Sequence, residues 1–207
     1  MQGAILCEFS GRVRDAFNAR GHMFYSLDLL PTDVPGPHVQ GDVIEHLNRL
    51  ADGALDLIVV HPSCTCLTVA GNSTYGRGMP KHDQRIKEAA WTQTLWHLCV
   101  RKARRVALEN PVGVLSSMTD IPKPVFVQPW QFGHKEQKKT GLHLHNLPSL
   151  VPTDIVYDEM MLLPKNQRER LHYLPPSPDR WKLRSTTFQG IADAMADQWG
   201  SLDPKGN

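Results

Sequence analysis

The chain has 207 residues, 41% of them hydrophobic and 21% charged, a composition that suits one compact domain with its own core. No run approaches the roughly 18 consecutive apolar residues that a membrane-spanning helix needs, and the N-terminus lacks the basic segment of a secretory signal. We therefore expect a cytoplasmic protein with no membrane partner. The net charge of +2 permits a nucleic-acid partner without requiring one, and the composition predicts no oligomeric state.

Four cysteines, Cys7, Cys64, Cys66 and Cys99, occur in a chain for which we expect a reducing compartment. They are therefore poor candidates for disulfides. Three of them lie in apolar or helical contexts, and we expect these to be buried as small hydrophobic residues. Cys64 differs because of the motif in which it stands.

The first two thirds of the chain alternate short apolar runs with segments of helical periodicity, as β-α-β units do. We expect a helix that carries Val13 and ends at Gly21. Strands are expected at residues 3–9, 23–29, 55–60 and 105–108, further helices after residues 41–42 and over residues 83–102, and a proline-rich loop at residues 31–37. This alternation predicts an α/β fold with a doubly wound, mostly parallel sheet.

The last third is less regular. Residues 125–131 and 141–145 fit strands, and residues 188–199 have apolar side chains on one helical face. Between them, residues 148–178 are rich in proline and charge. We therefore expect a single domain over residues 1–207, with an irregular insert at about residues 148–184.

Polar side chains collect where the expected strands end. They are Glu8, Ser10, Asp28, Asp42, Cys64, Glu109 and Asn110. Any one of them alone is explained as a helix cap. In open parallel sheets, however, ligands bind beyond the carboxyl ends of the strands. The collection as a whole therefore predicts a site at that edge.

The most specific motif runs from Asp56 to Gly71 and reads D-L-I-V-V-H-P-S-C-T-C-L-T-V-A-G. It resembles the signature of the cytosine-5 DNA methyltransferases, in which D-L-I-V-G-G leads into P-P-C-Q and then F-S-x-A-G. The run from Pro62 to Thr65 stands where P-P-C-Q would be, and both ends of the motif align without a gap. The resemblance implies that Cys64 is the nucleophile.

Other motifs follow in the family's order along nearly the whole chain. Phe9-Ser10-Gly11 resembles F-A-G of the cofactor loop, Gly41-Asp42-Val43 resembles G-D-I, Glu109-Asn110-Pro111 resembles E-N-V, and Phe132-Gly133-His134 with Gln137-Lys138-Lys139 resembles F-G-V-P-Q-x-R-x-R. The resemblance implies a Rossmann-like class I methyltransferase fold, S-adenosylmethionine as cofactor and DNA as partner. It places Phe9, Ser10, Gly11, Asp28, Asp42 and Pro62 at the cofactor, with Asp28 on the ribose and Asp42 on the adenine.

The implied chemistry explains why these residue types are needed. Carbon 5 of cytosine is a poor nucleophile, and a Cys64 thiolate that adds at carbon 6 makes it enamine-like. Glu109 would hydrogen-bond ring nitrogen 3, for which we expect a sheltered carboxyl group with a raised pKa. Lys138 or Lys139 would bind the O2 oxygen or a phosphate. We expect Glu109 to face Cys64 across one cleft, with Cys66 packed inside.

Several positions depart from the family's pattern. Arg12-Val13 follow Gly11, so the second and third glycines of the cofactor loop are missing, and we expect crowding there. Ser63 and Thr65 replace a proline and a glutamine, and lysines replace the later arginines. The insert stands where the family carries a large target-recognition domain. The chain thus resembles the small members of the family that phages often encode.

Three alternatives stay open besides DNA methylation. The same thiolate chemistry would serve a free nucleotide, an RNA or an already modified pyrimidine, and the missing recognition domain favours this. A non-catalytic nucleic-acid-binding relative is favoured by the altered cofactor loop. A metal site at His61, Cys64 and Cys66 is disfavoured by its spacing, so we expect no metal.

Two further expectations concern substrate binding. Residues 71–81 are polar and glycine-rich, and we expect them to be mobile and to close over a flipped base. The basic clusters at residues 101–105, 135–139 and 180–184 should form one continuous face if the substrate is a polymer.

Overall fold

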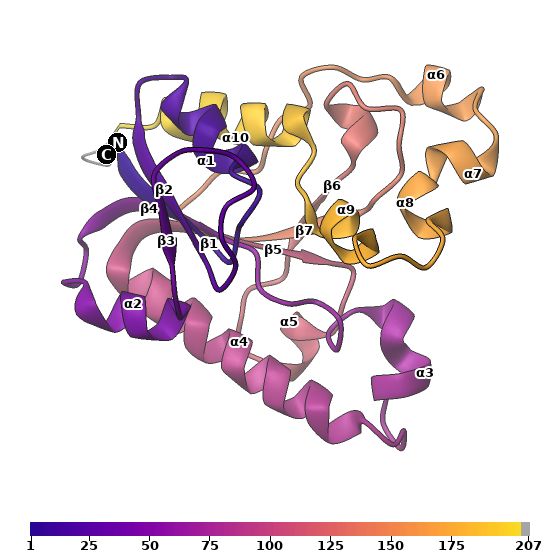
Figure 1. Cartoon of the computed structure of the whole chain (residues 1–207), viewed down its shortest axis with the longest axis horizontal. Helices are drawn as coiled ribbons and strands as arrows, with labels where there is room; N and C mark the ends of the chain where they lie inside the picture. Colours follow the sequence, from indigo (N-terminus) through magenta and orange to yellow (C-terminus); the bar gives the residue numbers. More distant parts are fainter. Residues whose placement is uncertain (204–207) are drawn as a thin grey trace.

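The computed structural model describes residues 1–203 and has a seven-stranded sheet at its centre (Figure 1). Its strands are β1 Gln2–Leu6, β2 Met23–Asp28, β3 His38–Gln40, β4 Leu55–Val60, β5 Ala103–Pro111, β6 Val125–Val127 and β7 Thr140–His145. They lie in the order β3-β2-β1-β4-β5-β7-β6, and β7 runs antiparallel to both of its neighbours. This order, with its reversed seventh strand, is that of the Rossmann-like class I methyltransferase fold, so the expected fold class is confirmed.

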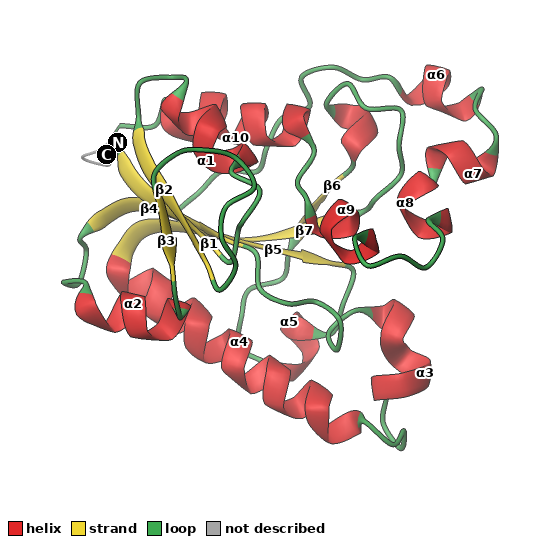
Figure 2. Ribbon diagram, viewed as in Figure 1, coloured by secondary structure: helices red, strands yellow, loops and turns green. Residues whose placement is uncertain are grey.

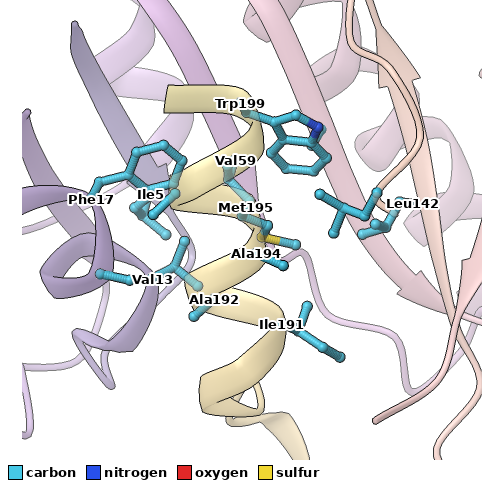
Figure 3. Close-up of a cluster of buried hydrophobic side chains, with 14 of the residues drawn as sticks. Ile5, Val13, Phe17, Val59, Leu142, Ile191, Ala192, Ala194, Met195 and Trp199 are labelled. Carbon is cyan, nitrogen blue, oxygen red and sulfur yellow. The ribbon is translucent and has the colours of Figure 1, made fainter. Parts of the chain in front are cut away.

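Helices cover both faces of the sheet (Figure 2). The helices α1 Arg12–Asn18 and α10 Gln189–Gly200 cover one face, and α2 Val43–Arg49, α4 His82–Lys102 and α5 Leu115–Met118 cover the other. Because successive strand residues point to opposite faces, β4 divides its side chains between two cores. Val59 packs toward α10 with Trp199 and Met195, as Figure 3 shows, while Ile58 packs toward α4.

Shorter elements connect and flank these layers. They are the 3-10 helices η1 Val69–Gly71 and η2 Pro129–Gln131, and the helices α3 Asn72–Tyr75, α6 Tyr157–Met161, α7 Lys165–Arg168, α8 Arg170–Tyr173 and α9 Arg180–Ser185. The segment 148–184, expected to be irregular, therefore consists of short helices joined by loops. Residues 71–81, expected to be mobile, include the helix α3, and their mobility stays a prediction.

Several strands differ from the expectation. The run expected as a strand over residues 125–131 is β6 only over Val125–Val127, and Pro129–Gln131 form the 3-10 helix η2. β1 ends at Leu6 because Cys7 has a φ of 55°, which breaks the extended backbone. β5 continues through Glu109 to Pro111, because β7 pairs with it along that whole length. The strand β3 was not predicted, since its three residues are largely exposed and carry no apolar run.

Within residues 1–203, no helix is both long enough and apolar enough to cross a bilayer.

The packing of α10 generates a stability prediction. Trp199 is fully buried, and its Nε1 donates to the Pro148 carbonyl at 3.0 Å. We expect Trp199→Ala to lower the free energy of unfolding by about 3–5 kcal/mol, since it leaves a large cavity. Trp91→Ala, on the exposed side of α4, should cost less than about 1 kcal/mol. Urea unfolding followed by circular dichroism measures both, and equal losses would contradict this packing.

Candidate active site

Cys64 lies in the loop that leaves the carboxyl end of β4. The His61 amide donates to the Leu6 carbonyl at 2.9 Å, which keeps the chain against β1, and Pro62 is buried. The Cys64 carbonyl then accepts from the amides of Leu67 and Thr68, both at 3.0 Å, so the backbone turns sharply at the cysteine. The thiol is left partly exposed at the strand end.

Arg85 of α4 holds the loop that carries Cys64 in place. It is 4% exposed, and its guanidinium donates to the carbonyls of Cys66 at 2.6 Å and Thr68 at 3.0 Å and to Asn72 Oδ1 at 2.8 Å. Cys66 is as partially exposed as Cys64, so the expectation that it packs inside is wrong. Arg85 holds the Cys66 backbone through its carbonyl, and the Cys66 side chain stays at the edge of the core.

Glu109 reaches the same place from the neighbouring strand. β5 pairs with β4 in parallel, with Val60 opposite Leu108, so Glu109, the next residue of β5, lies beside the point where the chain leaves β4. The Glu109 side chain is only 17% exposed, and its Oε2 accepts from His61 Nδ1 at 3.4 Å. His61 Nε2 is buried and has no partner within residues 1–203.

The charges of this cluster act on the Cys64 thiol. Burial raises the pKa of Cys64, and the nearby Glu109 carboxylate raises it further. Lys138 and Arg184 lower the pKa, but by less in total. The thiol is therefore the dominant form in the free protein, and the two cations limit the cost of forming the thiolate.

The ionisation of Glu109 differs from the expectation. Burial alone would raise the pKa of Glu109, but the His61 hydrogen bond and the charges of Lys138 and His61 lower it below its ordinary value. The expected raised pKa of Glu109 is thus wrong for the free protein. The sequence suggested the burial of the carboxyl group but not the hydrogen bond from His61. At neutral pH Glu109 is a carboxylate.

The two candidate lysines have different surroundings. Lys138 Nζ donates to the Arg184 carbonyl at 2.7 Å, and its charge acts on both Cys64 and Glu109. Lys139 Nζ lies 4.4 Å from the centre of the Phe126 ring instead. The structure therefore brings Lys138 to the cluster and leaves Lys139 apart from it.

The cofactor loop after β1 is built around a buried carboxylate. Glu8 is 5% exposed and accepts from the Ser10 hydroxyl and from the Arg12 amide, the latter at 3.2 Å. Its Oε2 is enclosed and has no partner in the described part of the chain. Gly11 has a φ of +74°, and a Cβ there would lie 2.5 Å from the Arg14 and Val34 side chains, so only glycine fits.

Asp28 and Asp42 lie at neighbouring strand ends. Asp28 pairs with Gln40 across β2 and β3. The carboxylates of Asp28 and Asp42 both raise the pKa of Cys7, which directly follows β1, so the two lie near each other at this edge of the sheet. Asp28 Oδ1 accepts from the Leu30 amide, and Asp42 caps α2 by accepting from the Glu45 amide, each at 2.9 Å.

Of the two residues expected to crowd the cofactor loop, Val13 is fully buried in the core against α10 and points away from the strand ends. Arg12 is exposed, and its guanidinium donates to the Thr187 carbonyl at 3.3 Å. The next residue, Arg14, is buried and donates to Ser26 Oγ at 3.1 Å and to the Pro35 carbonyl at 3.2 Å, which holds the loop that follows β2. Crowding of the cofactor by Arg12 stays a prediction.

The helix α9 covers the cofactor loop. The Trp181 ring lies 5.4 Å from the Phe9 ring, and Lys182 Nζ lies 3.2 Å from Asp33 Oδ1. Because the Arg184 carbonyl accepts from Lys138, the same helix joins the Phe9 side of the cleft to the Cys64 side.

The basic clusters do not form one face. Lys102 is buried and donates to Asp52 at 2.6 Å, and Arg105 donates to the Asp203 carbonyl at 2.6 Å, both at the amino end of β5. Glu109 lies toward the other end of that strand. The clusters at 135–139 and 180–184 meet through Lys138, so the expected continuous face lacks its first member.

The donor and acceptor groups of the cleft fit S-adenosylmethionine. That molecule offers an ammonium group, ribose hydroxyls and an adenine amino group, which all donate hydrogen bonds. The strand ends offer carboxylates at Glu8, Asp28 and Asp42, and Oε2 of Glu8 is an acceptor that no donor of residues 1–203 satisfies.

Among the described residues, no three His, Cys, Asp or Glu side chains gather as metal ligands would.

Comparisons with known proteins give structural matches alone. No family model and no curated protein matches the sequence. A candidate DNA modification methyltransferase encoded within an E. coli prophage aligns over 80% of this chain and 56% of its own, at 11% identity and a TM-score of 0.46. The Entamoeba histolytica methyltransferase EhMeth aligns over 75% and 57%, at 12% and 0.48. The chain thus spans little more than half of either structure, and the fold assignment rests on the strand order rather than on these likenesses.

Two residues of this region were not predicted from the sequence in the roles that they have here. His61 stands in the cysteine motif and was considered only as a metal ligand, although its position next to Pro62 was a usable signal. Arg85 had no such signal, because only the folded chain brings α4 to the cysteine loop. Arg184 was expected only as a member of the basic cluster 180–184, and its place beside Lys138 depends on the packing of α9.

The charges around Cys64 generate a reactivity prediction. Glu109→Gln removes a negative charge, so the pKa of Cys64 should fall and its alkylation by iodoacetamide at pH 8 should accelerate several-fold. Lys138→Met should slow alkylation, and Lys139→Met is the matched control that should leave it unchanged. Mass spectrometry of the Cys64 peptide follows the rate. Equal effects of the two lysine variants would contradict the arrangement.

Proposed function

We propose that this chain is an S-adenosylmethionine-dependent methyltransferase that acts on carbon 5 of cytosine in DNA, with Cys64 as nucleophile. The observation that carries the proposal is the meeting of Cys64, Glu109 and Lys138 at the carboxyl ends of β4 and β5. Their arrangement supports reaction at one pyrimidine ring, because a thiol, a carboxylate and a cation face a common space.

Cys64 supplies the covalent step. Its thiolate forms a bond from Sγ to carbon 6 of cytosine, and the electron pair of the 5,6 double bond moves toward carbon 5 and the ring. After carbon 5 has been alkylated and has lost its hydrogen as a proton, the Sγ bond breaks and the thiolate returns. The partial exposure of Cys64 leaves room for the ring to approach.

Glu109 holds the ring and its added negative charge. Since Glu109 is ionised in the free site, its hydrogen bond with ring nitrogen 3 requires that one proton be taken up together with the base. His61 keeps the carboxylate oriented through its Nδ1 hydrogen bond. Lys138 would stabilise the oxygen at carbon 2 with its ammonium group.

The cofactor would be held by the cleft at β1, β2 and β3. Glu8 would accept from its ammonium group, and Asp28 and Asp42 from its ribose and adenine. When bound, S-adenosylmethionine supplies the methyl group. Phe9, covered by Trp181, provides an apolar wall that excludes water from that part of the cleft.

A free cytosine nucleotide is the second candidate substrate. The observation that favours it is the separation of the 101–105 cluster from the others, which shortens the basic surface available to a polymer. The cations that remain beside the site, Lys138 and Arg184 among them, suit one phosphate or a short single strand.

Covalent trapping tests the proposal and separates the two substrates. A single-stranded oligonucleotide that contains 5-fluorocytosine should form a denaturation-stable adduct in the presence of S-adenosylmethionine, because fluorine blocks the final elimination at carbon 5. Cys64→Ser should abolish the adduct, and Cys66→Ser, the matched control, should retain it. Adduct formation with 5-fluoro-dCMP alone would select the free nucleotide. Trapping that survives Cys64→Ser would refute the assigned nucleophile.

A further inference from the structure

Asn110 follows Glu109 in β5 and lies on the opposite face of the sheet. Glu109 shares the face of Ala107, toward α10, while Asn110 shares that of Leu108, toward α4 and α5. Asn110 is 1% exposed. Neither its Oδ1 nor its Nδ2 has a hydrogen-bond partner anywhere in residues 1–203.

A buried amide with both ends unpaired is costly, because both ends have lost water and gained nothing in exchange. An apolar residue of similar size at this position would avoid that cost. Val106 and Leu108 precede Asn110 on the same face and are core residues, so burial alone does not require an amide here. The unpaired donor and acceptor therefore point to a ligand.

Asn110 forms part of the wall of a pocket of about 220 Å³, which Ser116, Lys123, Phe126 and His143 also line. This volume lies below the roughly 300–1,000 Å³ of pockets for drug-sized ligands. The pocket therefore suits a group of one or two small rings. Phe126 lines the pocket and is 43% exposed, so part of its ring is accessible to such a group.

His143 adds a second acceptor. Its Nδ1 lies 2.5 Å from the Pro122 carbonyl, which can only accept, so Nδ1 carries the hydrogen. Burial lowers the pKa of His143, and the ring is neutral at physiological pH. Its Nε2 is then an acceptor in the wall of the same pocket, since His143 pairs with Leu108 one step along the face that Asn110 shares.

We propose that this pocket binds a nucleobase that carries an amino group, as adenine and cytosine do. The base edge presents an amino donor next to a ring-nitrogen acceptor, which matches the Asn110 carbonyl and amide groups. The ring stacks on Phe126. Lys123 at the rim and Lys139, 4.4 Å from the Phe126 ring centre, face the phosphate. This role would account for Lys139, which lies apart from the Cys64 cluster.

The base comes either from a free nucleotide or from an unpaired nucleotide in a strand. The inference goes beyond the proposed function and does not depend on it, because the pocket lies on the other face of β5 from Glu109. Titration calorimetry on the full chain with CMP, AMP and short single-stranded oligonucleotides distinguishes the sources. Ribose 5-phosphate, which has no base, and UMP, which has no amino group, are the control ligands.

We expect CMP or AMP to bind at least about tenfold more tightly than UMP, and ribose 5-phosphate to show no binding. Asn110→Leu should abolish this binding while the thermal midpoint stays equal or rises, since two unpaired polar atoms are removed. Phe126→Ala, at an exposed side chain, is the second variant should Asn110→Leu fail to fold. Trp91→Ala, at an exposed position of α4 that does not line the pocket, is the matched control and should retain binding.

Three results would overturn the inference. Equal binding of ribose 5-phosphate would mean a phosphate site at the lysines alone. Loss of nucleotide binding in Glu109→Gln with retention in Asn110→Leu would place the nucleotide in the Cys64 cleft. Absence of binding by every nucleotide and oligonucleotide would mean that only water fills the pocket. None of these depends on trapping at Cys64, so failure here and failure of the proposed function are distinguishable.

Discussion

The parallel pairing of β4 with β5 is the constraint on which the rest of the site depends. It aligns Val60 with Leu108, so the loop that carries Cys64 leaves β4 beside the last residues of β5, which include Glu109. The reversed strand β7 then pairs with β5 through Pro111, which keeps Glu109 inside a regular ladder rather than in a flexible loop. Arg85 of α4 holds the loop that carries Cys64 by its hydrogen bond to the Cys66 carbonyl.

The closeness that would serve catalysis also lowers the thiolate fraction of Cys64 in the free site. Glu109 is held as a carboxylate by His61 and Lys138, and that charge raises the pKa of the Cys64 thiol. If binding of the base brings a proton to Glu109, the charge that opposes thiolate formation disappears at the moment the thiolate is needed. Such coupling would protect an exposed cysteine from side reactions until a pyrimidine occupies the cleft.

The sequence predicted the fold class and the edge of the sheet where the polar residues gather. Short apolar runs such as residues 55–60 indicate buried strands. A parallel sheet brings the carboxyl ends of such strands together at one edge. The ionisation of Glu109 could not be predicted, because it depends on a hydrogen bond from His61 across two strands. The separation of Lys138 from Lys139 was equally hidden, since adjacent residues in a loop have no fixed relative direction. The short, exposed strand β3 had no apolar signal.

Direct detection of the product tests the central claim. The protein is incubated with S-adenosylmethionine carrying a deuterated methyl group and with single-stranded DNA, and the nucleosides are then resolved by mass spectrometry. The account predicts labelled 5-methylcytosine that is absent with Cys64→Ser and strongly reduced with Glu109→Gln. Label on another atom or base, or label that persists in Cys64→Ser, would contradict the assignment of Cys64 and Glu109 to one pyrimidine ring.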